Sequence, residues 1–154
     1  RMFVKFREIT GWTFGVLQQF NTDLSSVERQ KYKKAALAPQ RVDFGDSRYT
    51  FQDADVVFGT LNPYKYDILE DFQGYKDIDK FKGLATWLFL MKNRHEGPAD
   101  KSIPYLMDPV GLSAEEIPDP EETRVMVELG SIEDPLIPFY EKAEEITKLN
   151  KLYI

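Results

Sequence analysis

The alternation of apolar and polar positions along the chain predicts buried strands separated by polar connections. Phe3, Phe6 and Ile9 recur at helical spacing, so residues 1–10 predict a helix that Gly11 ends. Four apolar runs predict strands, at Trp12–Phe20, Asp55–Leu61, Leu84–Met91 and Ile103–Met107. We expect the last two strands to pair as a hairpin, because a Gly-Pro turn lies between them.

The polar connection before the second predicted strand contains a loop and a short helix. Residues 21–42 show no steady periodicity and predict a long loop. Asp46 or Ser47 is expected to cap a short helix that runs to Gln52, because either side chain accepts a hydrogen bond from an early helical N–H. The sequence therefore predicts an irregular segment that leads directly into a strand.

The end of the chain differs in composition from the rest. Residues 111–154 combine prolines with dense acid, and they predict an extended acidic arm with a last helix from about Pro138 to Leu149. The strands and helices before this arm predict an α/β fold over residues 1–110. In such folds polar residues gather at the carboxyl ends of the strands, where ligands bind.

Composition narrows the class of protein. The chain of 154 residues is 42% apolar and 14% aromatic, which is typical of a folded globular protein. No apolar run approaches the ~20 residues that a bilayer span needs, so we expect a cytoplasmic protein without a membrane partner. The chain has no cysteine and one histidine, His95, which excludes thiolate and His-rich metal sites, and no metal site is predicted.

The net charge of −6 is unevenly spread. Residues 115–154 hold 11 acidic and 4 basic side chains, whereas residues 1–114 hold 15 and 16. The acidity therefore belongs to the arm. The charge of the body neither supports nor excludes binding to DNA.

Lys92 and Arg94 form the first candidate site. They flank Asn93 at the end of a predicted strand, and the period of two places both side chains on one face. Two cations fixed at a strand end suit the charge that develops in phosphoryl transfer. The alternative is a solvated, charged turn.

Two further groups of polar residues have open interpretations. Gln19 ends an apolar run, where a neutral donor could reach a phosphate or simply bond to nearby backbone. Gln52, Asp53 and Asp55 could hold a metal or act as acid and base, or they could orient the loop and the strand that follows. The aromatic residues of Tyr64–Phe81 could stack on bases, although packing in the core is favoured.

Three segments, in this order, resemble the ATPase domain of DnaB-type replicative DNA helicases. They are Val16–Asn21 (VLQQFN) followed by Ser25–Gln30, then Asp43–Val57 (DFGDSRYTFQDADVV), and then Lys92–Pro98 (KNRHEGP). The resemblance covers about residues 6–108. It implies the C-terminal half of a RecA-like core of the P-loop NTPase type.

The resemblance assigns roles to the candidate residues. It implies that Gln19 senses the γ-phosphate, and that Lys92 and Arg94 reach the nucleotide of the adjacent subunit in a hexameric ring. It implies that the loop Arg41–Phe51 faces single-stranded DNA. Within that loop the expected DNA contacts are Arg41, Asp46 and Arg48, and the residues expected to orient the loop are Gln52, Asp53 and Asp55. The loop departs from the family pattern at Gly45, Arg48 and Phe51, so a positive charge is kept but moved to Arg48, which is the strongest candidate for a DNA contact.

The phosphate-binding motif G-x-x-x-x-G-K-[ST] does not occur in the sequence. The resemblance implies that this motif, and the acidic strand that holds Mg²⁺, lie upstream. We therefore expect a fragment of a longer helicase that uses ATP and Mg²⁺ to unwind DNA 5′ to 3′ in a bacterial or phage-infected cell. The chain alone is expected to bind no nucleotide and to be inactive.

Two alternatives remain at this point. The chain could be a non-catalytic RecA-like relative that serves as a binding or assembly module. It could also be an unrelated structural or interaction protein of the phage type, in which the three segments match by chance.

Overall fold

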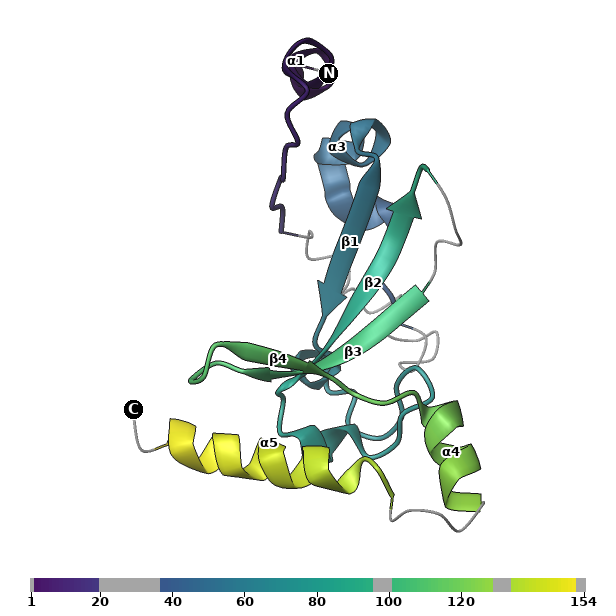
Figure 1. The fold of residues 1–154 in the computed structure, drawn as a ribbon, viewed down its shortest axis with the longest axis vertical. Helices are drawn as coiled ribbons and strands as arrows, with labels where there is room; N and C mark the ends of the chain where they lie inside the picture. Colours follow the sequence, from purple (N-terminus) through teal and green to yellow (C-terminus); the bar gives the residue numbers. More distant parts are fainter. Residues whose placement is uncertain (1, 20–36, 96–100, 129–133, 152–154) are drawn as a thin grey trace.

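The centre of the fold is a four-stranded antiparallel sheet (Figure 1). The computed structural model describes residues 2–19, 37–95, 101–128 and 134–151. Strands β1 (Val56–Leu61), β2 (Ala85–Asn93), β3 (Lys101–Asp108) and β4 (Ser113–Glu116) are neighbours in chain order. The described part is therefore α/β, as predicted, but every strand pair in it is antiparallel.

Most of the predicted elements are confirmed. The predicted hairpin is the antiparallel pair β2–β3, in which Leu88 lies opposite Ile103. The predicted helices correspond to α1 (Met2–Thr10), α3 (Arg48–Asp53) and α5 (Ile137–Asn150). The sequence did not predict β4, α4 (Pro120–Glu128) or the length of the 3₁₀ helix Arg41–Ser47, and two more 3₁₀ helices lie at Pro63–Tyr66 and Ile78–Phe81.

The predicted strand at Trp12–Phe20 is wrong over its described part. Residues 11–19 have no regular secondary structure and are exposed. Their apolar residues fit the pattern of a strand, but none of the described strands pairs with them. The predicted loop at 21–42 lies mostly outside the described residues.

The hydrophobic core lies on one face of the sheet, under the connection between β1 and β2. Trp87 of β2 is fully buried, and its ring packs edge-on against Phe72 at 5.1 Å and Tyr75 at 5.6 Å between ring centroids. Phe81 is also fully buried. The preference for core packing over base stacking is therefore confirmed for these aromatic residues of the connection.

A glycine fixes the turn that leads from this connection into β2. Gly83 has a φ of +76°, and a Cβ atom there would come within 3.0 Å of the Tyr64 ring. The Asn62 side chain ties the turn together, since its Nδ2 donates to Gly83 O at 2.6 Å and its Oδ1 accepts from Tyr64 N at 3.1 Å. Glycine is required here both for its backbone conformation and for the close ring.

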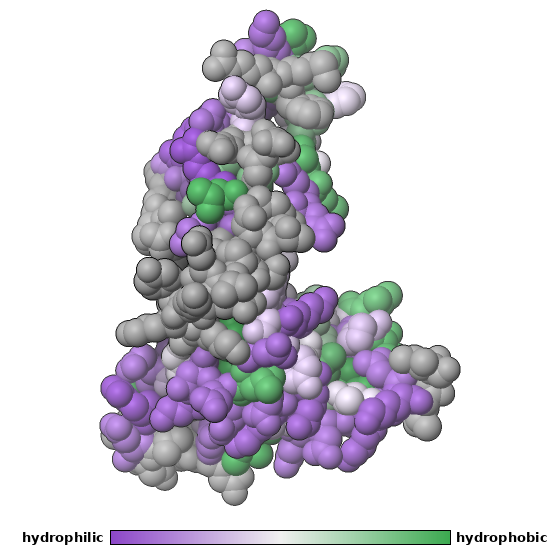
Figure 2. Space-filling model, turned by 180° about the vertical axis from the view of Figure 1, so that it is seen from behind, coloured by the Kyte–Doolittle hydropathy of each residue, from purple (hydrophilic) through white to green (hydrophobic). Residues whose placement is uncertain are grey.

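The last helix of the acidic arm packs on the rest of the molecule. Ala143 and Ile146 of α5 are buried, and the Tyr140 ring lies 4.8 Å from that of Phe81. Lys142 Nζ donates to Glu115 Oε2 at 2.5 Å, which joins α5 to β4. In Figure 2 hydrophilic residues gather over the lower part of the molecule, where α4 and α5 lie. None of the described helices is long and apolar enough to cross a membrane.

Tyr140 makes the docking of α5 sensitive to alkaline pH. Burial, followed by the nearby Asp134 and Asp77, raises the pKa of Tyr140 to about 12. The unfolded tyrosine titrates at about 10, so the folded protein keeps a proton that the unfolded chain loses between these values. The free energy of unfolding should therefore fall as the pH rises from about 10 towards 12.

We expect the Tyr140→Phe variant to lose part of this pH dependence. Urea unfolding at pH 9 and pH 11, followed by circular dichroism, measures the difference for both proteins. Lys80, whose pKa is raised by its hydrogen bond to Asp77, is present in both proteins, so only the difference between the two slopes reports on Tyr140. Equal slopes would show that Tyr140 is solvated in the folded protein.

Candidate functional site

Lys92 and Arg94 lie together at the end of β2, as their spacing predicted. Lys92 Nζ donates to Phe51 O and Gln52 O, each at 2.8 Å. Arg94 Nη2 donates to the same Gln52 O at 2.8 Å. A cation of β2 and a cation directly after it therefore converge on a single carbonyl oxygen.

This arrangement has a physical cause in α3. The last carbonyl groups of a helix have no partner within it and carry the negative end of its dipole. Phe51 and Gln52 belong to the last turn of α3, so their carbonyl oxygens attract cations. Because β1 and β2 are antiparallel, the end of β2 lies beside the start of β1 and next to α3. The expected gathering of polar residues at carboxyl ends of several strands is thus wrong, and the cations meet a helix end instead.

Asp55 is the anionic partner of Arg94. Its Oδ1 accepts from Arg94 Nη1 at 3.1 Å, and its Oδ2 pairs with Arg7 of α1. His95 Nε2 lies 4.0 Å from the same Oδ1. Asp55 therefore connects α1 to the end of β2.

Arg41 adds a third cation to the site. Two cations approach the Phe51 ring: Arg41 Cζ lies 5.9 Å from the ring centroid, and Lys92 Nζ lies 5.5 Å from it. Burial lowers the pKa of Lys92, and the nearby Arg94 and Arg41 lower it further. The structure thus brings together a predicted DNA contact and both members of the predicted catalytic pair.

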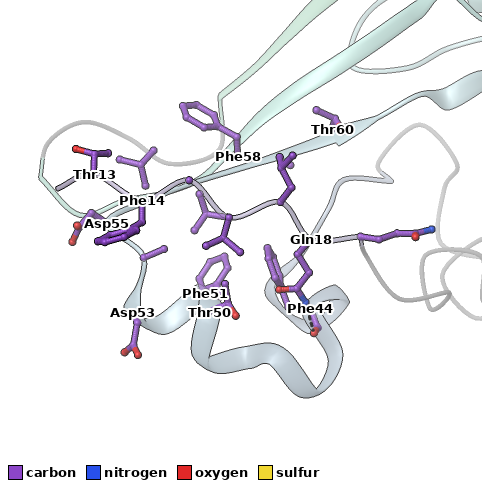
Figure 3. A pocket seen from close by; sticks show the side chains of 18 of the residues that line it. Thr13, Phe14, Gln18, Phe44, Thr50, Phe51, Asp53, Asp55, Phe58 and Thr60 are labelled. Atoms are coloured by element: carbon purple, nitrogen blue, oxygen red, sulfur yellow. Dashed lines mark hydrogen bonds between the residues drawn. The ribbon is translucent and has the colours of Figure 1, made fainter. Parts of the chain in front are cut away.

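A groove of about 840 Å³ runs between residues 13–19 and β1 (Figure 3). Phe44, Phe51 and Phe58 are among the residues that line it. Asp53 and Asp55 lie at one end, and Gln18 lies towards the other, where its Nε2 donates to Phe44 O at 3.3 Å.

Gln19 also lines the groove, but Lys92 and Arg94 do not. Gln19 follows Gln18 in the chain, and its side chain is exposed. The structure therefore brings Asp55, Lys92 and Arg94 together, and places Gln19 at the groove apart from the two cations.

The side chains of two predicted DNA contacts, Asp46 and Arg48, lie outside what the structure describes. Asp46 belongs to the 3₁₀ helix Arg41–Ser47 and Arg48 begins α3, but their side chains are not among the described ones. Within the described residues, no group of three or more His, Asp or Glu side chains could hold a metal ion.

The sequence did not reveal the roles of Arg7 and Phe51. Arg7 lies 48 positions from Asp55, and no local pattern marks such a distant ion pair. Phe51 is one of many aromatic residues, and only the fold shows that two cations face its ring. Comparisons of the chain with protein-family models, with curated proteins and with solved structures found no match.

Proposed function

We propose that this chain is the C-terminal portion of a RecA-like ATPase core in an ATP-dependent replicative DNA helicase that works as a hexameric ring. The observation that carries the proposal is the convergence of Arg41, Lys92 and Arg94 at the end of β2. A pair of cations fixed by backbone carbonyls is preorganised to meet a phosphoryl group, and such groups stabilise developing charge without reorganising.

The proposal accommodates the antiparallel sheet. RecA-like cores are built on parallel strands, whereas the four described strands are antiparallel. In the proposed helicase these strands form the later part of the core, and the upstream part supplies parallel strands and the phosphate-binding loop. The bound ATP and Mg²⁺ belong to the intact protein. This chain contributes Lys92 and Arg94 to a neighbouring subunit's nucleotide, and Gln19 senses the γ-phosphate.

A second candidate function is a non-catalytic binding or assembly module. It is favoured by the partners that the cations already have, since Lys92 and Arg94 bond to carbonyl oxygens of their own chain and Arg94 also pairs with Asp55. In that role the cation cluster, which consists of Arg41, Lys92 and Arg94, only holds α3 and, through Asp55, α1 against the sheet.

The length of the gene product, read from the coding sequence upstream of Arg1, distinguishes these two candidate functions. A G-x-x-x-x-G-K-[ST] segment roughly 100–150 residues upstream of Arg1 is expected for the helicase. The intact mass of the expressed protein and its ATPase activity with single-stranded DNA then complete the test. A start codon directly before Arg1, or no DNA-stimulated hydrolysis, would leave the binding module.

We expect Arg48→Ala to weaken binding of the intact protein to single-stranded DNA. Contacts to phosphates release counterions, so losing one contact should lower the slope of log K against log salt by about 1. Fluorescence anisotropy with a labelled oligonucleotide at several salt concentrations measures both effects. Arg124→Ala is the matched control, because Arg124 lies exposed on α4, away from the cation cluster. A slope equal to that of the unmodified protein would remove Arg48 from the DNA surface.

A further inference from the structure

The turn between β3 and β4 is held in one conformation by its own side chains. Asp108 Oδ1 accepts hydrogen bonds from Val110 N and Gly111 N, each at 2.9 Å, so the carboxylate closes the turn from within. A Cβ atom at Gly111 would lie 2.6 Å from Asp108 Oδ2, so any side chain there would displace the carboxylate from this position. The β3–β4 hairpin therefore ends in a rigid tip.

Leu112, the last residue of this turn, is unfavourable for the fold in two ways. Its φ of 51° lies in the left-handed region, where glycine is free of strain and leucine is not. Its side chain is 89% exposed, so it adds almost nothing to the buried core. Backbone strain and exposed apolar area that do not serve folding are typical of sites that serve binding.

Further apolar surface accompanies Leu112 on the same hairpin. Val110 is 46% exposed in the same turn, and Met107 is 42% exposed near the end of β3. We call Met107, Val110 and Leu112 the hairpin patch. The hairpin projects to the left in Figure 1, and Figure 2, seen from behind, shows hydrophobic residues gathered on the corresponding side of the lower part, next to hydrophilic ones. Single exposed apolar residues are ordinary, but a group of them on a rigid projection marks an interaction surface.

The surroundings of the hairpin patch are acidic. Residues 105–116 include three acidic side chains and no basic one. On the α5 side of the hairpin, the hydrogen bond to Glu115 raises the pKa of Lys142, and the charges of Asp108 and Glu145 raise it further. Three carboxylates thus act on one ammonium group, which leaves a net negative charge beside the patch.

We infer that the hairpin patch binds an amphipathic helix of another protein, in which lysine or arginine residues flank an apolar stripe. Val110 and Leu112 stand exposed on a rigid turn, so each can enter the hole between four side chains of a facing helix. The acidic surroundings favour a basic partner, because opposite charges across an interface speed association and like charges oppose it. The inference goes beyond the proposed function and does not depend on it.

Two other occupants fit the hairpin less well. A partner strand would have to pair with β4, which has only four residues and carries Glu115 and Glu116. Short, charged edges are a means by which natural sheets prevent such pairing. A second copy of this chain, joined through the same patch about a two-fold axis, would bring two acidic hairpins together.

Binding of model helices to the 154-residue chain tests this docking site. The probe is a fluorescently labelled, amidated peptide of about 14 residues, roughly four helical turns, with leucine along one stripe and lysine elsewhere. One control peptide has serine in place of every leucine, and another has glutamate in place of every lysine. In an anisotropy titration we expect each control to bind at least ~10-fold more weakly, because the first lacks the apolar stripe and the second repels the acids.

Leu112→Gly distinguishes binding from folding. Glycine suits the φ of this position, so urea unfolding should give a free energy of unfolding no lower than that of the unmodified chain. The affinity for the leucine–lysine peptide should nevertheless fall at least ~10-fold, because the exposed side chain is gone. Val125→Ala is the matched control. Val125 is 49% exposed on α4, which Figure 1 shows on the opposite side of the lower part, and its variant should bind as the unmodified chain does.

Glu116→Lys tests the charge of the site. It should lower the affinity for the peptide at least ~10-fold, because a cation then faces the lysines of the probe. Glu128→Lys makes the same change of charge on the exposed surface of α4 and should leave the affinity unchanged. Three results would each overturn the inference: equal losses for the two charge variants, an unchanged affinity in Leu112→Gly, or self-association of the 154-residue chain in sedimentation velocity that Leu112→Gly abolishes.

Discussion

Arg94→Ala in the intact ATPase should lower DNA-stimulated turnover by about 10³–10⁵-fold, the range found for arginines that act on a neighbouring subunit's phosphate. Nucleotide affinity should change little, because in the proposed helicase the residue acts on transition-state charge in the adjacent subunit. Steady-state ATP hydrolysis with single-stranded DNA, together with binding of a fluorescent nucleotide, measures the two quantities separately.

The contacts of Arg94 supply the control for this experiment. Its guanidinium also holds Gln52 O and Asp55, so alanine could act by loosening α3. Arg94→Lys keeps a charge for the carbonyl oxygen but loses the planar, bidentate donor. If Arg94 is catalytic, we expect both Arg94→Ala and Arg94→Lys to lose turnover. Arg94→Lys could instead retain full turnover, or Arg94→Ala could leave turnover unchanged while it lowers the free energy of unfolding. Either result would mean that Arg94 caps α3 and has no role in trans.

Periodicity predicted the parts of the site that depend on one element alone. The alternation of side chains along a strand placed Lys92 and Arg94 on one face, and both reach Gln52 O. The apolar runs of β1, β2 and β3 were found because each is buried on at least one face, which leaves a pattern in the sequence. Helix α5 (Ile137–Asn150) agrees with the last helix that was predicted from about Pro138 to Leu149.

Features that depend on two distant segments could not be predicted in this way. The strand expected at Trp12–Phe20 is absent from the described residues 12–19 because a strand exists only when another strand pairs with it, and an apolar pattern does not supply the partner. The pairing of Arg7 with Asp55 depends on where α1 lies against the sheet. The sheet direction was predicted only for the β2–β3 hairpin. A continuous apolar run such as that of β2 is typical of parallel strands, yet β2 pairs antiparallel with both of its neighbours.

Trp87→Ala should destabilise the 154-residue chain by about 3–5 kcal/mol, the usual cost of deleting a large aromatic side chain from a core. Trp87 is fully buried, and its ring packs against Phe72 and Tyr75 in the centre of the core. Its removal leaves a cavity between the sheet and the connection that covers it. Urea unfolding followed by far-ultraviolet circular dichroism measures the change.

Trp87→Phe separates the packing of the ring from the cost of its polar atom. Among the described residues, Trp87 Nε1 is buried without a hydrogen-bond partner. An unsatisfied buried donor costs about 1–3 kcal/mol, so phenylalanine removes this cost while it keeps part of the ring contact. We therefore expect Trp87→Phe to be far less destabilising than Trp87→Ala. Equal losses for the two variants would mean that the indole N–H is satisfied in the folded protein, for example by a bound water, and that its hydrogen bond contributes to stability as well as the ring.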